Sequence, residues 1–316
     1  MAVFAAGAFA QQSKLDQAIE LYRQDKFDSA LAILQNEDQK NAAVRNYTGL
    51  AYFGKGDFKK AITNLEKAVQ IEPGNIAFRS NLASVYLING EKKKARAETN
   101  RILAADPQNT TGLVLRGRIR LVEKDFDRAI EDADLAMKSE PRNAQAYTLK
   151  SDALLQKYFL SVTKGDHRKE AGLLHQASEI LQGCLKTCGE SEETPFQKRR
   201  LDILTAFTEM AERKPFDPNA PVEPPPPGTT RFKIITKPGV EYTSRARDEK
   251  ITGVVRLLIL LGADGTIPHI VVVKGLGGGL SEQAVRAARQ IQFEPKRVNG
   301  QPVSAVVLIE YSFAIY

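Results

Sequence analysis

The chain has 316 residues, of which 42% are hydrophobic and 26% charged, a composition that is ordinary for globular protein and sufficient for two or three domains. Its formal net charge is +7, and residues 231–316 carry +5 of it, with twelve Lys or Arg and seven Asp or Glu. These charges are scattered, without a basic block or interleaved aromatic residues, so we expect no nucleic-acid binding. No segment reaches the roughly 18 consecutive apolar residues that span a bilayer, so we expect no transmembrane helix in this chain.

An apolar stretch opens the chain. Residues 1–10 read MAVFAAGAFA, and Ala8-Phe9-Ala10 fits the small-x-small pattern that precedes a signal-peptidase cut. The basic segment that normally begins a secretory signal is missing, so we interpret residues 1–12 as the remnant of a signal peptide. The alternative is a frayed apolar tail.

A period of 34 residues follows. Pro73, Pro107 and Pro141 stand 34 residues apart, and other residue types recur in step with them. The positions in register are Asn75, Asn109 and Asn143; Gly49, Ala83, Gly117 and Ser151; Ala61, Ala95 and Ala129; Ala68, Ile102 and Ala136; and Tyr52 and Tyr86. This spacing resembles that of the tetratricopeptide repeat, over about residues 13–185.

The residue types explain the repeat physically. Each unit is expected to be two antiparallel helices, with small residues that let the pair pack closely. A proline marks the end of each second helix, because proline cannot continue the hydrogen-bonded backbone. Since one unit cannot bury its apolar face alone, the units stack into an α-solenoid. We assign residues 13–213 to this solenoid, with capping helices near 170–187 and 195–213.

The resemblance implies a ligand groove lined by the first helix of each unit. The matching positions here are Asn46, Leu50, Phe53, Ser80, Ser84, Leu87, Val114, Arg118, Leu121, Thr148 and Asp152. A chaperone-binding subclass clamps a terminal carboxylate with a set of Lys, Asn and Arg that this groove does not carry, so its ligand is a different, unknown one. For any single groove residue, solvated surface is the simpler interpretation.

Two cysteines, Cys184 and Cys188, lie four residues apart in a helical stretch. They fit either a disulfide near a helix end, in an oxidising compartment, or two small semi-buried thiols. The three histidines, His167, His175 and His269, do not cluster with them at the spacing of a zinc site. We therefore expect no metal and no other cofactor.

A proline-rich segment, residues 214–230, follows the solenoid. It contains Pro215, Pro218, Pro221, Pro224, Pro225, Pro226 and Pro227. Such a run favours an extended polyproline helix of about 3 Å per residue, long enough to hold two modules up to roughly 50 Å apart. We predict that it is a linker and spacer.

Residues 231–316 alternate strand and helix signals. The apolar runs 251–261 and 266–274 flank Gly262-Ala263-Asp264-Gly265, which predicts a hairpin. Ser281 is a suitable N-cap for a helix, which we expect Phe293-Glu294-Pro295 to end. Asn299-Gly300 then turns the chain into a last strand, 303–313. The predicted order is β-β-α-β with an antiparallel sheet, so the fold class is a multidomain α plus α/β chain.

This module resembles the C-terminal domain of TonB-family energy transducers. The features that match, in order over about 75 residues, are Tyr242 with Arg245-Ala246, Ile251 to Val255, Ala263-Asp264-Gly265, Ala287, Phe293-Glu294-Pro295 and Asn299 to Val303. One departure is Thr243, where the family usually has proline after the tyrosine, and another is the lack of an aromatic residue near Ile291. We expect the fold to survive both changes and receptor recognition to differ.

The resemblance implies a periplasmic domain that binds an extended segment of an outer-membrane receptor by β-augmentation, in which backbone hydrogen bonds supply affinity. The edge strand here comprises Val303, Ala305, Val306, Val307, Leu308, Ile309, Glu310, Tyr311 and Phe313. Alternation puts Val306, Leu308, Glu310 and Ser312 on one face, and Val307, Ile309, Tyr311 and Phe313 on the other. The alternative is an edge that is protected or paired in a homodimer.

No catalytic pattern assembles, because the chain carries no Gly-x-Ser-x-Gly, phosphate-loop or zinc motif. We therefore predict a non-enzymatic, exported protein-binding adaptor of the Gram-negative cell envelope, whose TonB-like domain couples to outer-membrane receptors in transmembrane transport. The alternative is a periplasmic scaffold or assembly factor, for peptidoglycan or an envelope complex, without a transport role. A third interpretation is an enzyme subunit whose catalytic partner docks on the repeats.

Overall fold

The computed structural model describes residues 14–163, 170–190, 194–212 and 226–314. The chain divides into two compact units, Met1–Pro141 and Arg142–Tyr316. The predicted signal remnant, residues 1–12, and most of the predicted linker lie outside the described residues. None of the helices in these four ranges is both long and apolar enough to cross a membrane.

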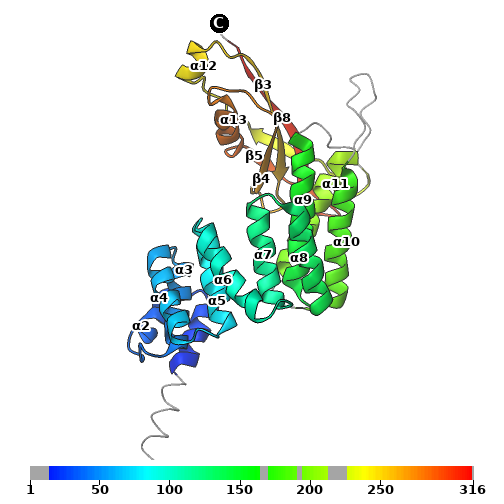
Figure 1. Cartoon of the computed structure of the whole chain (residues 1–316). Coiled ribbons are helices and arrows are strands. Elements are labelled where there is room, and N and C mark those ends of the chain that lie inside the picture. The colour runs from blue at the N-terminus through cyan, green and yellow to red at the C-terminus, as the bar shows by residue number, and fades with distance from the viewer. Residues whose placement is uncertain (1–13, 164–169, 191–193, 213–225, 315–316) are drawn as a thin grey trace, which may run out of the picture. The chain divides into compact units, whose positions relative to one another are not determined.

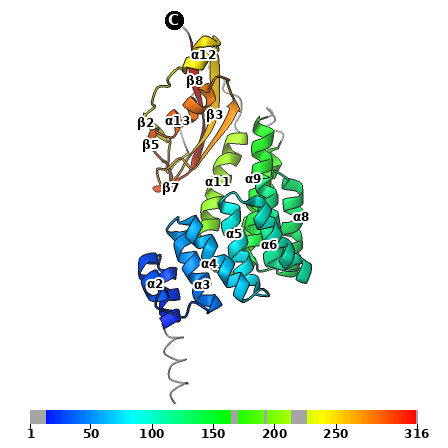
Figure 2. The same ribbon diagram turned by 60° about the vertical axis from the view of Figure 1, so that its left-hand side comes forward.

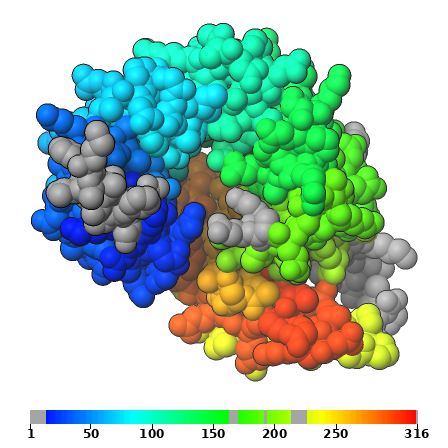
Figure 3. All heavy atoms as spheres, turned by 90° about the horizontal axis from the view of Figure 1, so that it is seen from below, coloured from blue at the N-terminus to red at the C-terminus, as the bar shows by residue number. Residues whose placement is uncertain are grey.

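The first unit is a stack of antiparallel helices (Figure 1). Its helices are 14–23, α2 (Phe27–Leu34), α3 (Ala42–Gly54), α4 (Phe58–Ile71), α5 (Ile76–Ile88), α6 (Lys92–Ala105), α7 (Thr110–Val122) and α8 (Phe126–Ser139). From α2 to α8 each helix contacts the next along the chain, and Figure 3 shows this stacking in chain order, from blue to teal. The 34-residue pattern thus yields the predicted solenoid, with α3, α5 and α7 as first helices and α4, α6 and α8 as second helices.

Asparagines at the same period begin the first helices. Asn41, Asn75 and Asn109 precede α3, α5 and α7, and each side chain accepts a hydrogen bond from a backbone N–H in the first turn. In α5 the donor is the amide of Phe78, at 3.2 Å. Such N-caps contribute about 1 kcal/mol each, so the asparagine period is a capping period.

The recurring small residues allow close helix packing. A Cβ atom on Gly49 of α3 would lie 2.7 Å from Cγ of Leu65 and 3.0 Å from the carbonyl oxygen of Ala61, both on α4. Ala61 and its equivalents Ala95 and Ala129 are fully buried. A larger residue at position 49 would push α3 away from α4, which is why this register position tolerates only small side chains.

Three helices open the second unit: α9 (Ala144–Thr163), α10 (Ala171–Thr187) and α11 (Thr194–Glu212). α10 packs against both of the others, and α10 and α11 coincide with the predicted capping helices. Cys184 and Cys188 are joined in a disulfide where α10 ends, and the buried Gln197 of α11 donates a hydrogen bond to Cys184 Sγ at 3.2 Å.

Short strands and two helices make up the rest of the second unit. They are β1 (Thr229–Thr230), β2 (Lys233–Thr236), α12 (Ser244–Asp248), β3 (Gly253–Leu261), β4 (His269–Lys274), α13 (Leu280–Ala288), β5 (Gln292–Glu294), β6 (Lys296–Val298), β7 (Gln301–Val303) and β8 (Ala305–Phe313). The main sheet is antiparallel in the order β4-β3-β8, and the small sheets are β1-β6-β7 and β2-β5. The predicted β-β-α-β order is confirmed in β3, β4, α13 and β8, while the sequence pattern does not reveal the other strands or α12.

Two local predictions are wrong. The residue before α13 is Gly279, at φ +82°, so Ser281 is not the N-cap. Its Oγ instead accepts from the amide of Leu276 and donates to the carbonyl of the same residue, both at 2.8 Å, which closes the glycine-rich loop. Moreover α13 ends at Ala288, well before Phe293, because Phe293 lies in β5 with its ring in the core.

The main sheet is covered on both faces. On one face Val255, Leu257 and Ile259 of β3 pack with Leu280 and Ala284 of α13, and Figure 1 shows α13 beside β3 and β4. On the other face, α9 contacts β4, and α11 contacts β3 and β8. The β3 and β8 side chains beneath these helices are buried, so α9 and α11 complete a second core over the sheet.

Aromatic rings connect α9, α11 and this sheet. The ring centre of Phe159 on α9 lies 4.9 Å from that of Phe207 on α11 and 6.1 Å from that of His269 in β4. Burial lowers the pKa of His269, which keeps its imidazole uncharged at neutral pH and suits the apolar contact with Phe159.

Tyr158 lies in the same aromatic cluster, with its ring centre 6.2 Å from that of Phe207. Its buried hydroxyl has no hydrogen-bond partner among the described residues. We predict that Tyr158→Phe raises the free energy of unfolding by about 1 kcal/mol at neutral pH, because an unpaired buried hydroxyl is costly. Urea unfolding followed by far-UV circular dichroism measures the change, and a less stable variant would show that this hydroxyl is bonded.

Alkaline pH should widen the difference between wild type and Tyr158→Phe. Burial raises the pKa of Tyr158 from 10.0 to about 12 in the folded protein. The stability contribution is therefore complete below about pH 10, where the unfolded state begins to lose the proton, and it falls as the pH rises toward about 12. The variant lacks this group, so we expect its unfolding free energy to fall less than that of the wild type across this window.

Candidate peptide-binding edge and repeat groove

β8 lies at one edge of the main sheet. It pairs with β3 continuously, from Ala305 opposite Leu261 to Phe313 opposite Gly253, and Figure 2 shows the two strands side by side. Val303, which the sequence groups with this strand, belongs instead to β7 and pairs with Lys296 of β6. The candidate edge is therefore Ala305–Phe313.

Side chains of β8 alternate as predicted along most of its length. The inward residues are Val307, Ile309, Tyr311 and Phe313, all in the core with α13, whereas Leu308, Glu310 and Ser312 are exposed. Leu308 has 46% of its surface exposed. Val306 departs from the alternation, because it is buried on the face that α11 covers.

Two hydrogen bonds reveal which backbone groups face the open side of β8. The amide of Ser304 donates to Asp202 Oδ1 of α11 at 3.0 Å, and the carbonyl of Glu310 accepts from Lys237 Nζ at 2.8 Å. Neither partner belongs to β3, and the N–H and C=O groups of successive strand residues point to opposite sides. Even-numbered residues of β8 therefore turn their backbone groups to the open edge, and odd-numbered residues bond to β3.

The open edge is blocked at two points. Asp202 accepts from both the amide and the hydroxyl of Ser304, which closes the N-terminal side of β8. Lys237 also lies over the ring of Tyr311, with Nζ 4.8 Å from its centre, a cation–π contact. In the part of the chain that the structure describes, nothing bonds to the outward backbone groups of Leu308, so the accessible edge is centred there.

α11 holds the sheet through three polar contacts. Asp202 bonds to Ser304, Arg199 pairs with Asp264 at 2.7 Å, and Glu209 pairs with Lys296 at 2.7 Å. Asp264 lies in the hairpin turn, where hydrogen bonds from Thr266 and then the charge of Arg199 lower the pKa of its carboxyl. The role of the predicted linker as a spacer stays a prediction, but α11 and the sheet that follows it are in direct contact.

Thr243, the departure from the family's Tyr-Pro pattern, has a role of its own here. Its Oγ1 accepts from the amide of Ala246, which caps α12, and donates to the carbonyl of Gly278 at 2.5 Å. Gly278 has φ +63°, and a Cβ there would lie 2.9 Å from Cβ of Ala246. The glycine run therefore serves close packing between α12 and the loop before α13.

The predicted groove residues are divided between the two units. Nine of them lie on α3, α5 and α7, and Thr148 and Asp152 lie on α9 of the second unit. Thr148 is buried, with its hydroxyl donating to the carbonyl of Ala144, and Asp152 accepts from Arg200 of α11 at 3.0 Å. These two side chains are engaged within their own unit.

Within the first unit, the groove positions differ in character. Phe53, Leu87 and Leu121 occupy equivalent positions of successive repeats and are all partly exposed, so they form an apolar row along α3, α5 and α7. Asn46 is only 3% exposed and accepts from Asn81 of α5 at 2.9 Å, which makes it a packing residue. The remaining groove residues are Leu50, Ser80, Ser84 and Arg118, all partly exposed, and Val114, which is buried.

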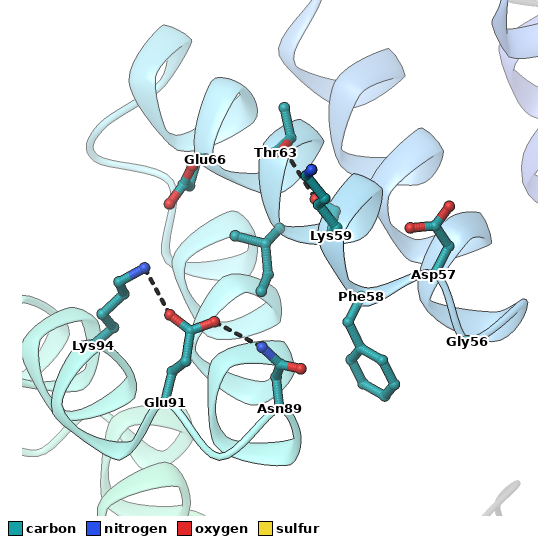
Figure 4. Close-up of a pocket in the computed structure, with 10 residues that line it drawn as sticks. Gly56, Asp57, Phe58, Lys59, Thr63, Glu66, Asn89, Glu91 and Lys94 are labelled. Carbon is teal, nitrogen blue, oxygen red and sulfur yellow. Dashed lines mark hydrogen bonds and ion pairs between the residues drawn. The ribbon is translucent and has the colours of Figure 1, made fainter.

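A polar pocket of the first unit lies away from these groove residues (Figure 4). It is lined by α4, the start of α6 and the turns at 56–57 and 89–91, and no groove residue takes part. Glu91 accepts from Asn89 at 2.7 Å and pairs with Lys94 at 2.6 Å, and the bond from Lys94 is the main reason that its pKa is lowered. Because this carboxylate is already paired, the pocket resembles solvated surface between repeat turns.

A buried polar row escaped the sequence analysis. Asn64, Glu98 and Asp132 stand 34 residues apart on α4, α6 and α8, and all three are buried. Arginines bind each of them: Arg45 bonds to Asn64, Arg79 and Arg101 to Glu98, and Arg116 and Arg120 to Asp132. The 34-residue period of these polar residues is the signal that would have revealed the row.

Stacked helix pairs and an antiparallel module with an accessible strand edge define a class of proteins that bind other proteins. The description "Gram-negative bacterial TonB protein C-terminal" matches residues 238–315, and two tetratricopeptide-repeat descriptions match residues 15–76 and 52–117. The chain is thus a tetratricopeptide-repeat protein with a C-terminal TonB-family domain. Both families are protein-interaction domains, so the chain has the parts of an interaction adaptor.

Solved structures resemble the helical part of the chain. TTC0263, a thermophilic TPR protein in Thermus thermophilus, is 14% identical with a TM-score of 0.51, and the match covers 62% of this chain and 98% of that one. MamA from Desulfovibrio magneticus RS-1 is 17% identical with a TM-score of 0.43, covering 54% of this chain and 95% of its own. The first likeness shows the fold alone. No curated protein matches the chain.

Proposed function

We propose that this protein is a non-enzymatic adaptor of the Gram-negative cell envelope, exported to the periplasm, whose β8 edge takes up an extended segment of an outer-membrane receptor. The observation that carries the proposal is the accessible edge around Leu308, where backbone groups face away from β3. The TonB-family match supports the choice of a receptor segment, since β-augmentation needs such an edge. In this role the protein couples receptors to transmembrane transport.

The repeat unit supplies a second protein-binding surface in this proposal. Phe53, Leu87 and Leu121 present one partly exposed apolar side chain per repeat, which suits an apolar stripe on a partner. We retain 13–213 as the repeat domain, 214–230 as the linker and 231–316 as the TonB-like domain. Among the described residues, no group of three or more His, Cys, Asp or Glu could hold a metal ion.

A periplasmic scaffold without a transport role is the second candidate. The observation in its favour is the set of polar contacts that fix α11 to the sheet, because a fixed arrangement suits assembly of a complex. A homodimer that pairs two β8 edges is a further outcome that the same experiment detects.

Site-specific photo-cross-linking in the source cell tests the proposal. A cross-linking amino acid replaces Leu308 in the full chain, and a matched control places it at Arg247, which is exposed on α12. We expect outer-membrane receptors among the products from position 308 and not from position 247. Products that contain only envelope-assembly proteins or cell-wall fragments would favour the scaffold, and a self-cross-linked dimer alone would reject receptor binding.

A further inference from the structure

Lys237 is the one side chain in the described part of the chain that bonds to an outward backbone group of β8 between Ala305 and Phe313. Its Nζ donates to the carbonyl of Glu310 at 2.8 Å and lies over the ring of Tyr311. The lysine itself is exposed and follows β2 directly. A strand that adds along β8 needs the Glu310 carbonyl for its own amide, so it must displace this ammonium group.

The side chain of Glu310 does not compete for Lys237. Its carboxylate pairs with Arg256 of β3 at 2.6 Å, on the outer face of the sheet. Lys237 meets the opposite face, where Tyr311 belongs to the core. The ammonium group therefore rests on a neutral carbonyl and an aromatic face, without a carboxylate partner among the described residues.

We propose that Lys237 is a displaceable cap on the β8 edge, and that it selects extended segments that carry a carboxylate on the side facing it. This inference rests on the proposed strand addition. A carboxylate is a stronger acceptor for an ammonium group than a carbonyl, since charge-assisted hydrogen bonds are shorter and stronger than neutral ones. When such a segment adds, Lys237 exchanges the Glu310 carbonyl for the incoming carboxylate, and the freed carbonyl accepts an amide of the new strand.

The cap also explains how the edge stays unpaired in the absence of a partner. Exposed strand edges template unwanted pairing, and lysine placed on the edge is a common way of preventing it. A neutral or basic strand gains no ion pair when it displaces Lys237, so it must offset the lost contacts with backbone hydrogen bonds alone. Lys237 thereby disfavours such strands and favours acidic ones.

Two synthetic peptides test this selection with the full chain. Each has nine residues that alternate Val with Asp in one peptide and Val with Asn in the other, so that the polar side chains match in shape and differ in charge. The alternation places a polar side chain opposite Lys237 in half of the registers. We expect the wild type to bind the Asp peptide about fivefold more tightly than the Asn peptide, as measured by fluorescence anisotropy, since a solvent-exposed ion pair contributes at most about this factor.

Lys237→Met removes the charge and keeps the length of the side chain, and Lys233→Met on β2 is the matched control for general attraction to acidic peptides. We expect Lys237→Met to abolish the preference for the Asp peptide and to bind the Asn peptide more tightly than the wild type does, because the cap is gone. Lys233→Met should keep the preference. An unchanged preference in Lys237→Met would overturn the selection by Lys237.

Leu308→Pro separates this inference from the proposed strand addition. If the preference follows Lys237 and both peptides lose affinity in Leu308→Pro, both ideas hold. If both peptides lose affinity in Leu308→Pro but Lys237→Met changes nothing, strand addition stands and the cap is rejected. If neither peptide binds the wild type, or if Leu308→Pro has no effect, strand addition at β8 is rejected and the cap falls with it.

Discussion

Replacing Arg116 and Arg120 together by methionine is expected to lower the free energy of unfolding of the first unit by about 3–5 kcal/mol. Both arginines bind the carboxylate of Asp132 on α8, each at 2.6 Å, and the Asp132 side chain is only 1% exposed. Without them a buried charge has no compensating partner, which costs far more than the loss of an exposed ion pair. Urea unfolding followed by far-UV circular dichroism measures the effect, since the chain has no tryptophan.

Two control variants make this result specific. Arg96→Met breaks the pair with Glu123, in which the arginine side chain is 55% exposed, and we expect a loss of at most about 1 kcal/mol. Adding Asp132→Leu to the double variant removes the uncompensated charge and should restore most of the stability. A double variant as stable as Arg96→Met would show that water or another group satisfies Asp132.

Leu308→Pro in the full chain is expected to weaken binding of the alternating Val–Asp peptide by at least about tenfold, because two effects add. Proline removes the outward N–H that an added strand needs, and its ring obstructs the approach of that strand. The bonds between β8 and β3 should remain, since Leu308 turns its backbone away from β3 and proline is tolerated on an edge strand facing solvent.

Neighbouring substitutions provide the controls. Leu308→Ala shortens the exposed side chain and keeps the N–H, so its affinity should stay within about threefold of the wild type. Ile309→Pro removes a bond to β3, the central strand of the sheet, and should unfold the module. Equal losses of affinity in Leu308→Ala and Leu308→Pro would mean that the leucine side chain, and not the backbone, holds the peptide.

Much of the fold could be predicted because its signals are local or periodic. The 34-residue spacing of Pro73, Pro107 and Pro141 gives the solenoid, and the alternation of apolar residues in 303–313 gives the faces of β8. Short strands such as β5 and β6 have only three residues each, so they carry no periodicity of their own. The same holds for the end of α13, where the core position of Phe293 overrides the helical pattern before it.

The candidate site was harder to predict because it depends on contacts between distant segments. The sequence alone suggests β8 as an edge, but the bond from Asp202 to Ser304 joins residues 102 positions apart, and that from Lys237 to Glu310 spans 73 positions. Neither lysine nor aspartate stands out in its local sequence. Likewise, the engagement of Asp152 with Arg200 within the second unit is a tertiary effect that repeat spacing cannot reveal.

Hydrogen exchange of single backbone amides in β8 tests the central claim most directly. The full chain is compared with and without the alternating Val–Asp peptide, and exchange is followed at Leu308, whose amide faces the open edge, and at Ile309, whose amide bonds to β3. Strand addition predicts that the peptide slows exchange at Leu308 strongly and changes Ile309 little. Peptide binding that leaves the exchange rate of Leu308 unchanged would contradict the account.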